Sequence, residues 1–129
     1  MDSKLERADF YDLSVGPFFD TMGLVGWMGI SQQTIDEGTV TGDILRVYTN
    51  DGVCLYPSFQ FDDAKMLLPH LREVLALIDP DNTDPWGSAL WLNSPAEEFT
   101  GRTPANTLRT GDAAAVVASA VRIGIALAR

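Results

Sequence analysis

The sequence predicts a mainly helical α+β protein, in which a winged helix-turn-helix-like element with a β-hairpin precedes a bundle of short helices. Three observations predict this fold: two short helical segments joined by a glycine turn, a hairpin turn at residues 50–52, and a series of helix-cap signals in the second half. We expect residues 1–61 to form the helix-turn-helix-like part and residues 62–129 the helical domain. No Gly/Ser/Pro-rich linker separates them, which favours one compact unit.

Two consecutive helices are predicted near the N-terminus. Residues 21–29 place three apolar side chains on one helical face, namely Met22, Val25 and Met28. Gly29 ends this helix, and Ser31 caps a second helix that we expect to run through Ile35. Helix, tight turn and helix in this order are typical of a helix-turn-helix element.

A β-hairpin is predicted directly after these helices. Residues 44–49 and 53–59 are rich in β-branched and aromatic side chains, and Asn50, Asp51 and Gly52 between them suit the positive φ angles of a tight hairpin turn. The hairpin therefore takes the place of the wing in a small winged helix-turn-helix.

The next predicted helix joins the two parts of the chain. Four apolar residues recur at helical spacing: Leu71, Val74, Leu75 and Ile78. Residues 79–82 end this helix with Asp, Pro and Asn. A further helix opens at Thr83, Asp84 and Pro85, because Asp or Thr accepts a bond from the first amides and proline at the first helical position loses no needed donor.

The following helix and two shorter ones carry the clearest signals. Helical spacing turns three large apolar side chains toward a core: Trp86, Leu90 and Trp91. Ser94 and Glu97 have the spacing of a capping box, which predicts a second short helix that Gly101 ends. Residues 103–104, Thr-Pro, open a third helix that runs through Leu108.

The last predicted helix, residues 112–129, is apolar nearly all the way round. Its large side chains span most of the helical wheel: Val116, Val117, Val121, Ile123, Ile125 and Leu127. We therefore expect burial on more than one side. Two interpretations stay open, a central core helix and a helix that docks a second copy of the chain or a partner. Gly124 indicates a bend or a tight helix crossing.

A joint pattern of tryptophan, proline and glycine residues runs through this second half. Its positions are Trp86, Trp91, Leu92, Pro95, Gly101, Arg102, Pro104, Leu108, Gly111 and Asp112. Over residues 60–128 the pattern resembles the C-terminal toxin-binding domain of the Xre/MbcA/ParS antitoxin family. The resemblance implies a type II toxin–antitoxin system whose toxin has a RES domain and degrades NAD. It also implies that this chain neutralises the toxin by covering its substrate entrance, without catalysis of its own.

Six residues are candidate partner-binding residues on this interpretation: Trp91, Arg102, Leu108, Arg109, Val117 and Val121. Tryptophan and arginine are favoured at the energetic centres of interfaces, and the two valines lie in the apolar final helix. The arginines lie in turns or at a helix end, where they suit charge-assisted contacts with a partner. For Arg102, bonding to helix-end carbonyls within its own turn is an equal alternative.

Charge bears on the competing interpretation, a DNA-binding transcriptional regulator. The chain has a net charge of −9, and its first 61 residues carry nine acidic side chains against three basic ones. Gln32 and Gln33 in the second helix suit adenine edges, but that helix has no Lys or Arg to contact phosphates. We therefore expect a packing or dimerisation role for this element, so a homodimer is a further expectation.

Other function classes find no support in the sequence. No nucleophile, base and orienting group occur at telling spacing, so we predict neither an enzyme nor a cofactor. A single cysteine and a single histidine, Cys54 and His70, do not make up a common structural zinc site. The N-terminus has no apolar signal region, and the longest apolar run, residues 113–121, is shorter than the ~20 residues of a membrane span. A cytoplasmic location without membrane contact is expected.

Overall fold

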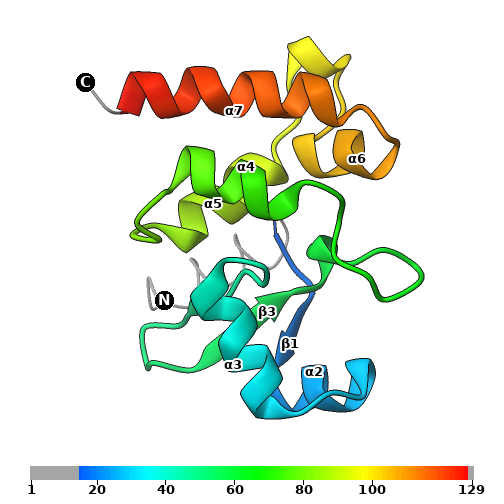
Figure 1. Cartoon of the computed structure of the whole chain (residues 1–129), viewed down its shortest axis with the longest axis vertical. Helices are drawn as coiled ribbons and strands as arrows, with labels where there is room; N and C mark the ends of the chain where they lie inside the picture. The colour runs from blue at the N-terminus through cyan, green and yellow to red at the C-terminus, as the bar shows by residue number, and fades with distance from the viewer. Residues whose placement is uncertain (1–14, 128–129) are drawn as a thin grey trace, which may run out of the picture.

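Helices dominate the computed structural model, which describes residues 15–127 and is drawn in Figure 1. The elements in chain order are β1 (Phe18–Asp20), α2 (Thr21–Met28), α3 (Gln32–Thr41), β2 (Val47–Tyr48), β3 (Cys54–Pro57), α4 (Leu71–Ile78), α5 (Pro85–Leu92), α6 (Pro104–Arg109) and α7 (Ala113–Leu127), with 3-10 turns at Ser58–Gln60 and Glu97–Phe99. The predicted class, mainly helical α+β, is confirmed.

The helix-turn-helix layout of α2 and α3 follows from local capping. The Asp20 carboxylate accepts a bond from the Gly23 amide at 2.7 Å, and α2 ends at Gly29, whose φ is 70°. The Ser31 hydroxyl accepts a bond from the Thr34 amide at 3.1 Å and starts α3. The predicted end of α3 at Ile35 is wrong: this helix continues to Thr41, because Ile35 and Thr39 share a buried face.

The wing hairpin forms around the predicted turn. The Gly52 amide donates to the Thr49 carbonyl at 2.9 Å, and Gly52 has a φ of 81°. Strands β2 and β3 are shorter than predicted. The antiparallel sheet has the order β1-β3-β2, so β1, which the sequence analysis missed, covers the other edge of β3. With only three residues, β1 is too short to show an alternating pattern.

A buried glutamine fixes the junction between the wing and the helical part. The Gln60 side chain is fully buried, its Oε1 accepts from the Leu45 amide at 2.8 Å, and its Nε2 donates to the Leu45 carbonyl at 3.0 Å. The same Nε2 donates to the Pro57 carbonyl at 3.0 Å. Both backbone groups of Leu45 are thus satisfied by one side chain in place of a neighbouring strand.

The helices of the second half begin where the sequence predicts, with one exception. Asp84 caps α5 by accepting a bond from the Gly87 amide at 3.0 Å, and Thr103 caps α6 by accepting from the Asn106 amide at 3.1 Å. The predicted capping box at Ser94 is wrong. The Ser94 hydroxyl donates backward to the Leu90 carbonyl at 2.7 Å, and residues 97–99 form a single 3-10 turn.

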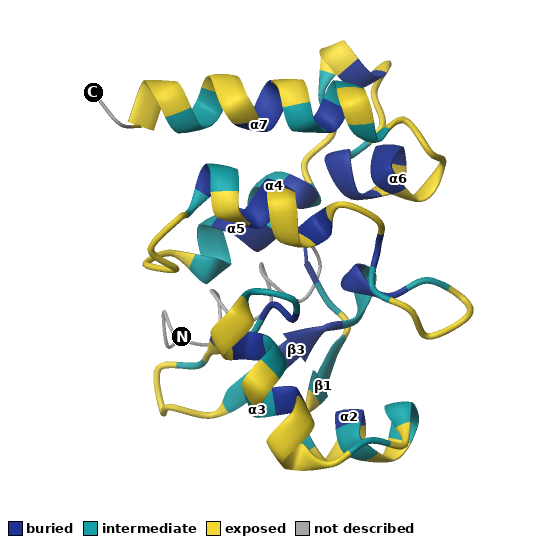
Figure 2. Ribbon diagram, viewed as in Figure 1, coloured by how far each residue is buried: buried dark blue, intermediate teal, exposed yellow. Residues whose placement is uncertain are grey.

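The last helix, α7, lies across α4 at one end of the molecule, while α2 lies at the opposite end (Figure 1). Burial of α7 on more than one side is wrong. Its buried residues are few: Val116, Ser119 and Ala120. Figure 2 shows exposed bands along the other side of the helix. The reason is that its main contacts, with α4, α6 and the turn at 97–99, cover one side of the helix.

Gly124 sets the closeness of the crossing between α7 and α4. A Cβ atom built at this position would lie 2.6 Å from the backbone carbonyl oxygen of Leu77. The tight crossing that the sequence predicts at Gly124 is therefore confirmed, since no larger residue fits without moving the backbone.

The buried apolar residues form two clusters. One lies under α2, α3 and the sheet, and it includes Ile44 and Tyr56. The other is larger, is built mainly from α4 to α7, and includes Leu45 and Val15 from the first half. Ile44 and Leu45 are adjacent in the chain but are buried in different clusters, so the link between α3 and β2 contributes to both.

We expect Gln60→Leu to destabilise the protein by about 2 kcal/mol or more, because it leaves the buried Leu45 amide and carbonyl without partners. Urea unfolding followed by circular dichroism measures the change. Gln33→Leu, on the exposed face of α3, is the matched control and should shift stability by no more than about 0.5 kcal/mol. Equal stability of the two variants would contradict the structural role of Gln60.

We expect Gly124→Ala to lower the free energy of unfolding by about 1–3 kcal/mol, because the new methyl group meets the Leu77 carbonyl. The control is Gly26→Ala in α2, where no atom lies within 4 Å of the added Cβ. This variant should gain up to about 1 kcal/mol from helix propensity. Thermal unfolding of both proteins makes the comparison, and a stabilised Gly124→Ala variant would exclude the close crossing.

Candidate docking groove

Two surfaces are candidates for function, the helix-turn-helix face and a groove beside α7. On the first, Gln32 and Gln33 are both exposed in the first turn of α3. The Gln33 Nε2 donates to Glu37 Oε1 at 3.2 Å within the same helix. The glutamines therefore have two acidic neighbours on α3, Asp36 and Glu37.

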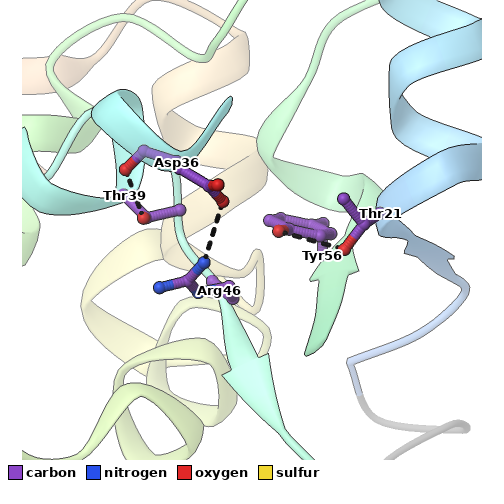
Figure 3. Close-up of polar contacts among 5 residues, drawn as sticks. All are labelled: Thr21, Asp36, Thr39, Arg46 and Tyr56. Atoms are coloured by element: carbon purple, nitrogen blue, oxygen red, sulfur yellow. Dashed lines mark hydrogen bonds and ion pairs between the residues drawn. The ribbon is translucent and has the colours of Figure 1, made fainter. Parts of the chain in front are cut away.

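A single cation, Arg46, lies in the described part of the helix-turn-helix element, and it is committed to a contact inside the protein. Its Nη1 lies 3.2 Å from Asp36 Oδ1 (Figure 3). Its guanidinium also lies over the Tyr48 ring, 5.2 Å from the centroid. Burial lowers the pKa of Arg46, but the neighbouring Tyr56, Tyr48 and Cys54 outweigh burial, so the net pKa is raised and the side chain stays charged.

The remaining described cations are also engaged within the chain. Arg72 pairs with Asp43 at 3.5 Å, Arg122 pairs with Glu98 at 2.6 Å, and the Lys65 Nζ donates to the Trp27 carbonyl at 3.1 Å. A DNA-binding face needs cations that are directed at phosphates. Within residues 15–127, none is directed outward from α3 or the wing.

The two candidate partner-binding arginines hold turns in place. Arg102 donates through Nε to the Phe99 carbonyl at 3.3 Å and through Nη1 to the Thr110 hydroxyl at 2.8 Å. Arg109 donates through Nη2 to the Phe59 carbonyl at 2.7 Å and through Nη1 to Asn106. Both remain exposed. The carbonyl-bonding alternative for Arg102 is thus the contact that the structure contains.

The predicted docking residues do not gather on one surface. Leu108 is fully buried in the larger core cluster, so its assignment to the docking surface is corrected: its side chain is a core residue. Val117 is half-buried against the same cluster, and Val121 is 39% exposed. Trp91 is half-buried and is the one predicted residue that lines the groove described next.

A groove of about 670 Å³ runs between α4, α5 and the C-terminal end of α7. Its apolar lining residues are Leu77, Ile78, Trp91, Ile123 and Leu127. Of these five, only Trp91 was predicted from the sequence as a partner-binding residue. A sequence signal exists for two of the others, Ile123 and Leu127. They are spaced at i and i+4, so they share one helix face, and Gly124 between them marks the close approach to α4.

Carboxylates form one rim of this groove. Asp79 accepts bonds from the Thr83 amide at 2.9 Å and the Asp84 amide at 2.8 Å, and Asp84 in turn caps α5. Asp81 lies between them on the exposed loop. The described lining residues include no Lys, Arg or His, so the rim is anionic.

The described residues offer little to other chemistries. They contain no group of three or more His, Cys, Asp or Glu side chains that is suited to hold a metal ion. No single described helix is long and apolar enough to cross a membrane, and only the pair 97–109 and 113–127, bent by 107°, passes by length and composition.

Comparison with known proteins adds a likeness in fold. The NMR structure of Rv2175c is similar to this chain, with a TM-score of 0.73 and 16% sequence identity over 84% of this chain and 81% of that one. At this identity the likeness shows a shared fold, and it supports a helix-turn-helix-like element in this chain. No protein-family model and no curated protein matches the sequence. The antitoxin resemblance therefore stays a prediction.

Proposed function

We propose that this protein binds another protein through its C-terminal helices and acts as an antitoxin-like neutraliser. The observation that carries the proposal is the uncovered apolar side of α7. Val121 and Ile125 are 39% and 57% exposed, on a helix whose other side packs into the core. Exposed apolar surface of this kind is typical of an interaction site.

The identity of the partner rests on the sequence pattern of residues 60–128. The pattern favours a RES-type toxin that degrades NAD, and the mechanism is occlusion of the toxin's active site by the helices around α7. This chain supplies no catalytic group in that mechanism. Its acidic surface suits a partner with a basic surface, because complementary potentials raise the rate of association.

We expect the product of the neighbouring gene to co-purify with this chain and to lose its NAD-degrading activity in the complex. Val121→Glu should weaken the complex by about tenfold or more, because it places a charge in the apolar contact. Val40→Glu is the matched control, since Val40 is 85% exposed on α3, in the other part of the chain. Titration calorimetry measures the affinity of each variant for the partner, and an NAD turnover assay measures how far each variant inhibits it. Equal loss in the two variants, or no stable partner in the pull-down, would count against the proposal.

DNA binding is the second candidate function, and the helix-turn-helix layout with its exposed Gln32 and Gln33 favours it. The charge of the element opposes it. Among residues 15–61, Arg46 is the only cation and it is paired with Asp36, whereas Asp43, Glu37 and Asp51 add further negative charge. Repulsion from the duplex then outweighs the contacts of two amide side chains.

We expect no retention of a promoter duplex by the isolated protein, even at low salt, because α3 and the wing direct no cation of residues 15–127 at the phosphates. Fluorescence anisotropy with a labelled fragment of its own promoter checks this. Binding that weakens steeply as salt rises would instead support the regulator and would assign phosphate contacts to residues outside 15–127. If the duplex does bind, Gln32→Ala is the control for base contacts, since it should abolish any preference for one DNA sequence.

A further inference from the structure

The groove between α4, α5 and α7 differs from the exposed side of α7 in shape and charge. Its floor is apolar, with Leu77 and Ile78 from α4, Trp91 from α5, and Ile123 from α7. Leu127, which is 70% exposed, lies on the same face of α7 as Ile123, near the C-terminal end of the helix. The groove therefore continues the proposed protein-binding surface around the end of α7.

The shape of the groove suits a helix better than an extended strand or a small molecule. Helices α4, α5 and α7 and the loop at residues 79–84 line it, so no unpaired strand edge is present in the lining for a peptide strand to extend. The groove is partly open to solvent, whereas small-molecule pockets enclose most of their ligand. Helix-in-groove binding uses apolar anchors at i, i+3, i+4 and i+7.

The rim selects the charge of the occupant. Asp79, Asp81 and Asp84 stand along the loop between α4 and α5, and no cation is present in the described lining. Arg122, the cation in the described part of α7, does not line the groove and is paired with Glu98 at 2.6 Å. An apolar helix flanked by Arg or Lys would meet the carboxylates while its anchors contact the floor.

A second copy of the chain is a poor occupant by the same reasoning. The protein carries a net charge of −9, so two copies repel each other, and the acidic rim would face an acidic molecule. The negative charge of the rim attracts a basic partner and repels a second copy of this chain.

We infer that the groove binds an amphipathic helix of the partner protein, with apolar anchors on the floor formed by Trp91, Leu77 and Ile123 and with Arg or Lys opposite Asp79, Asp81 and Asp84. This inference rests on the proposed protein-binding function and names the chemistry of the partner segment. The proposed contact predicts that the binding free energy has two parts: burial of the apolar anchors, and attraction between the rim and the Arg or Lys side chains, which weakens as salt is added.

The test uses the full chain, labelled with ¹⁵N, and a synthetic helical peptide of about 15 residues that carries leucines at i, i+3, i+4 and i+7 flanked by arginines. The protein has three tryptophans, so three indole N–H signals report on three places. The Trp91 signal, assigned with Trp91→Phe, should shift and saturate. The Trp27 signal should stay in place, because Trp27 packs against Phe19 and Phe61 in the other core cluster.

Charge is tested with matched peptides and matched variants. A peptide with glutamates in place of the arginines should not bind, and binding of the arginine peptide should fall as salt is raised to about 0.5 M. Asp81→Lys should weaken binding by about fivefold or more, because Asp81 is exposed at the rim. Asp63→Lys changes net charge equally on an exposed loop that does not line the groove, and it should have little effect.

Several outcomes would overturn the inference: no saturable Trp91 shift, equal binding of the glutamate peptide, equal effects of Asp81→Lys and Asp63→Lys, or concentration-dependent self-association that shifts Trp91. The proposed function fails separately. If the arginine peptide binds as expected but no neighbouring gene product co-purifies, the groove assignment stands and the antitoxin proposal falls. If the natural partner binds without shifting Trp91, the groove assignment falls alone.

Discussion

The contact between the Gln60 side chain and the backbone of Leu45 is the constraint on which the arrangement of the two halves depends. One carboxamide satisfies the amide and the carbonyl of Leu45, in a place where no strand lies beside that residue. Desolvation makes such groups costly when they lack partners, so the segment keeps one position. With Leu45 fixed, its side chain enters the larger cluster while that of Ile44 enters the smaller one. This segment therefore joins the wing to the helical bundle, together with contacts such as those of Arg109 with the Phe59 carbonyl and of Arg72 with Asp43.

Local signals in the sequence were sufficient for most element starts. Ser31, Asp84 and Thr103 act within their own turn of the chain, so a cap can be recognised without knowing the fold. Ser94 shows the limit of such reasoning. Its hydroxyl has two possible partners, the amide ahead and the carbonyl behind, and the preceding α5 helix provides the carbonyl of Leu90. Strand β1 was missed because its pairing partner lies in β3, more than 30 positions along the chain.

The candidate site was harder to predict than the fold because a groove is made of residues from separate elements. Trp91 was recognisable by residue type, whereas Leu77 and Ile123 look like ordinary core residues in their own helices. Leu108 was misplaced for the opposite reason. It belongs to a sequence pattern, but the side chain points into the core, and a pattern does not distinguish a residue that shapes a surface from one that supports it. The apolar composition of α7 predicted burial on several sides, yet composition does not tell whether the chain itself or another molecule covers a helix.

The three carboxylates at the rim of the groove differ in how freely they can be substituted. Asp79 and Asp84 also organise the turn before α5 through bonds to the backbone, so replacing either one disturbs the start of that helix. Asp81 has no such role among the hydrogen bonds of residues 15–127. Substitution at Asp81 therefore disturbs the fold less than substitution at Asp79 or Asp84, and the negative charge of those two residues is retained because the turn depends on them.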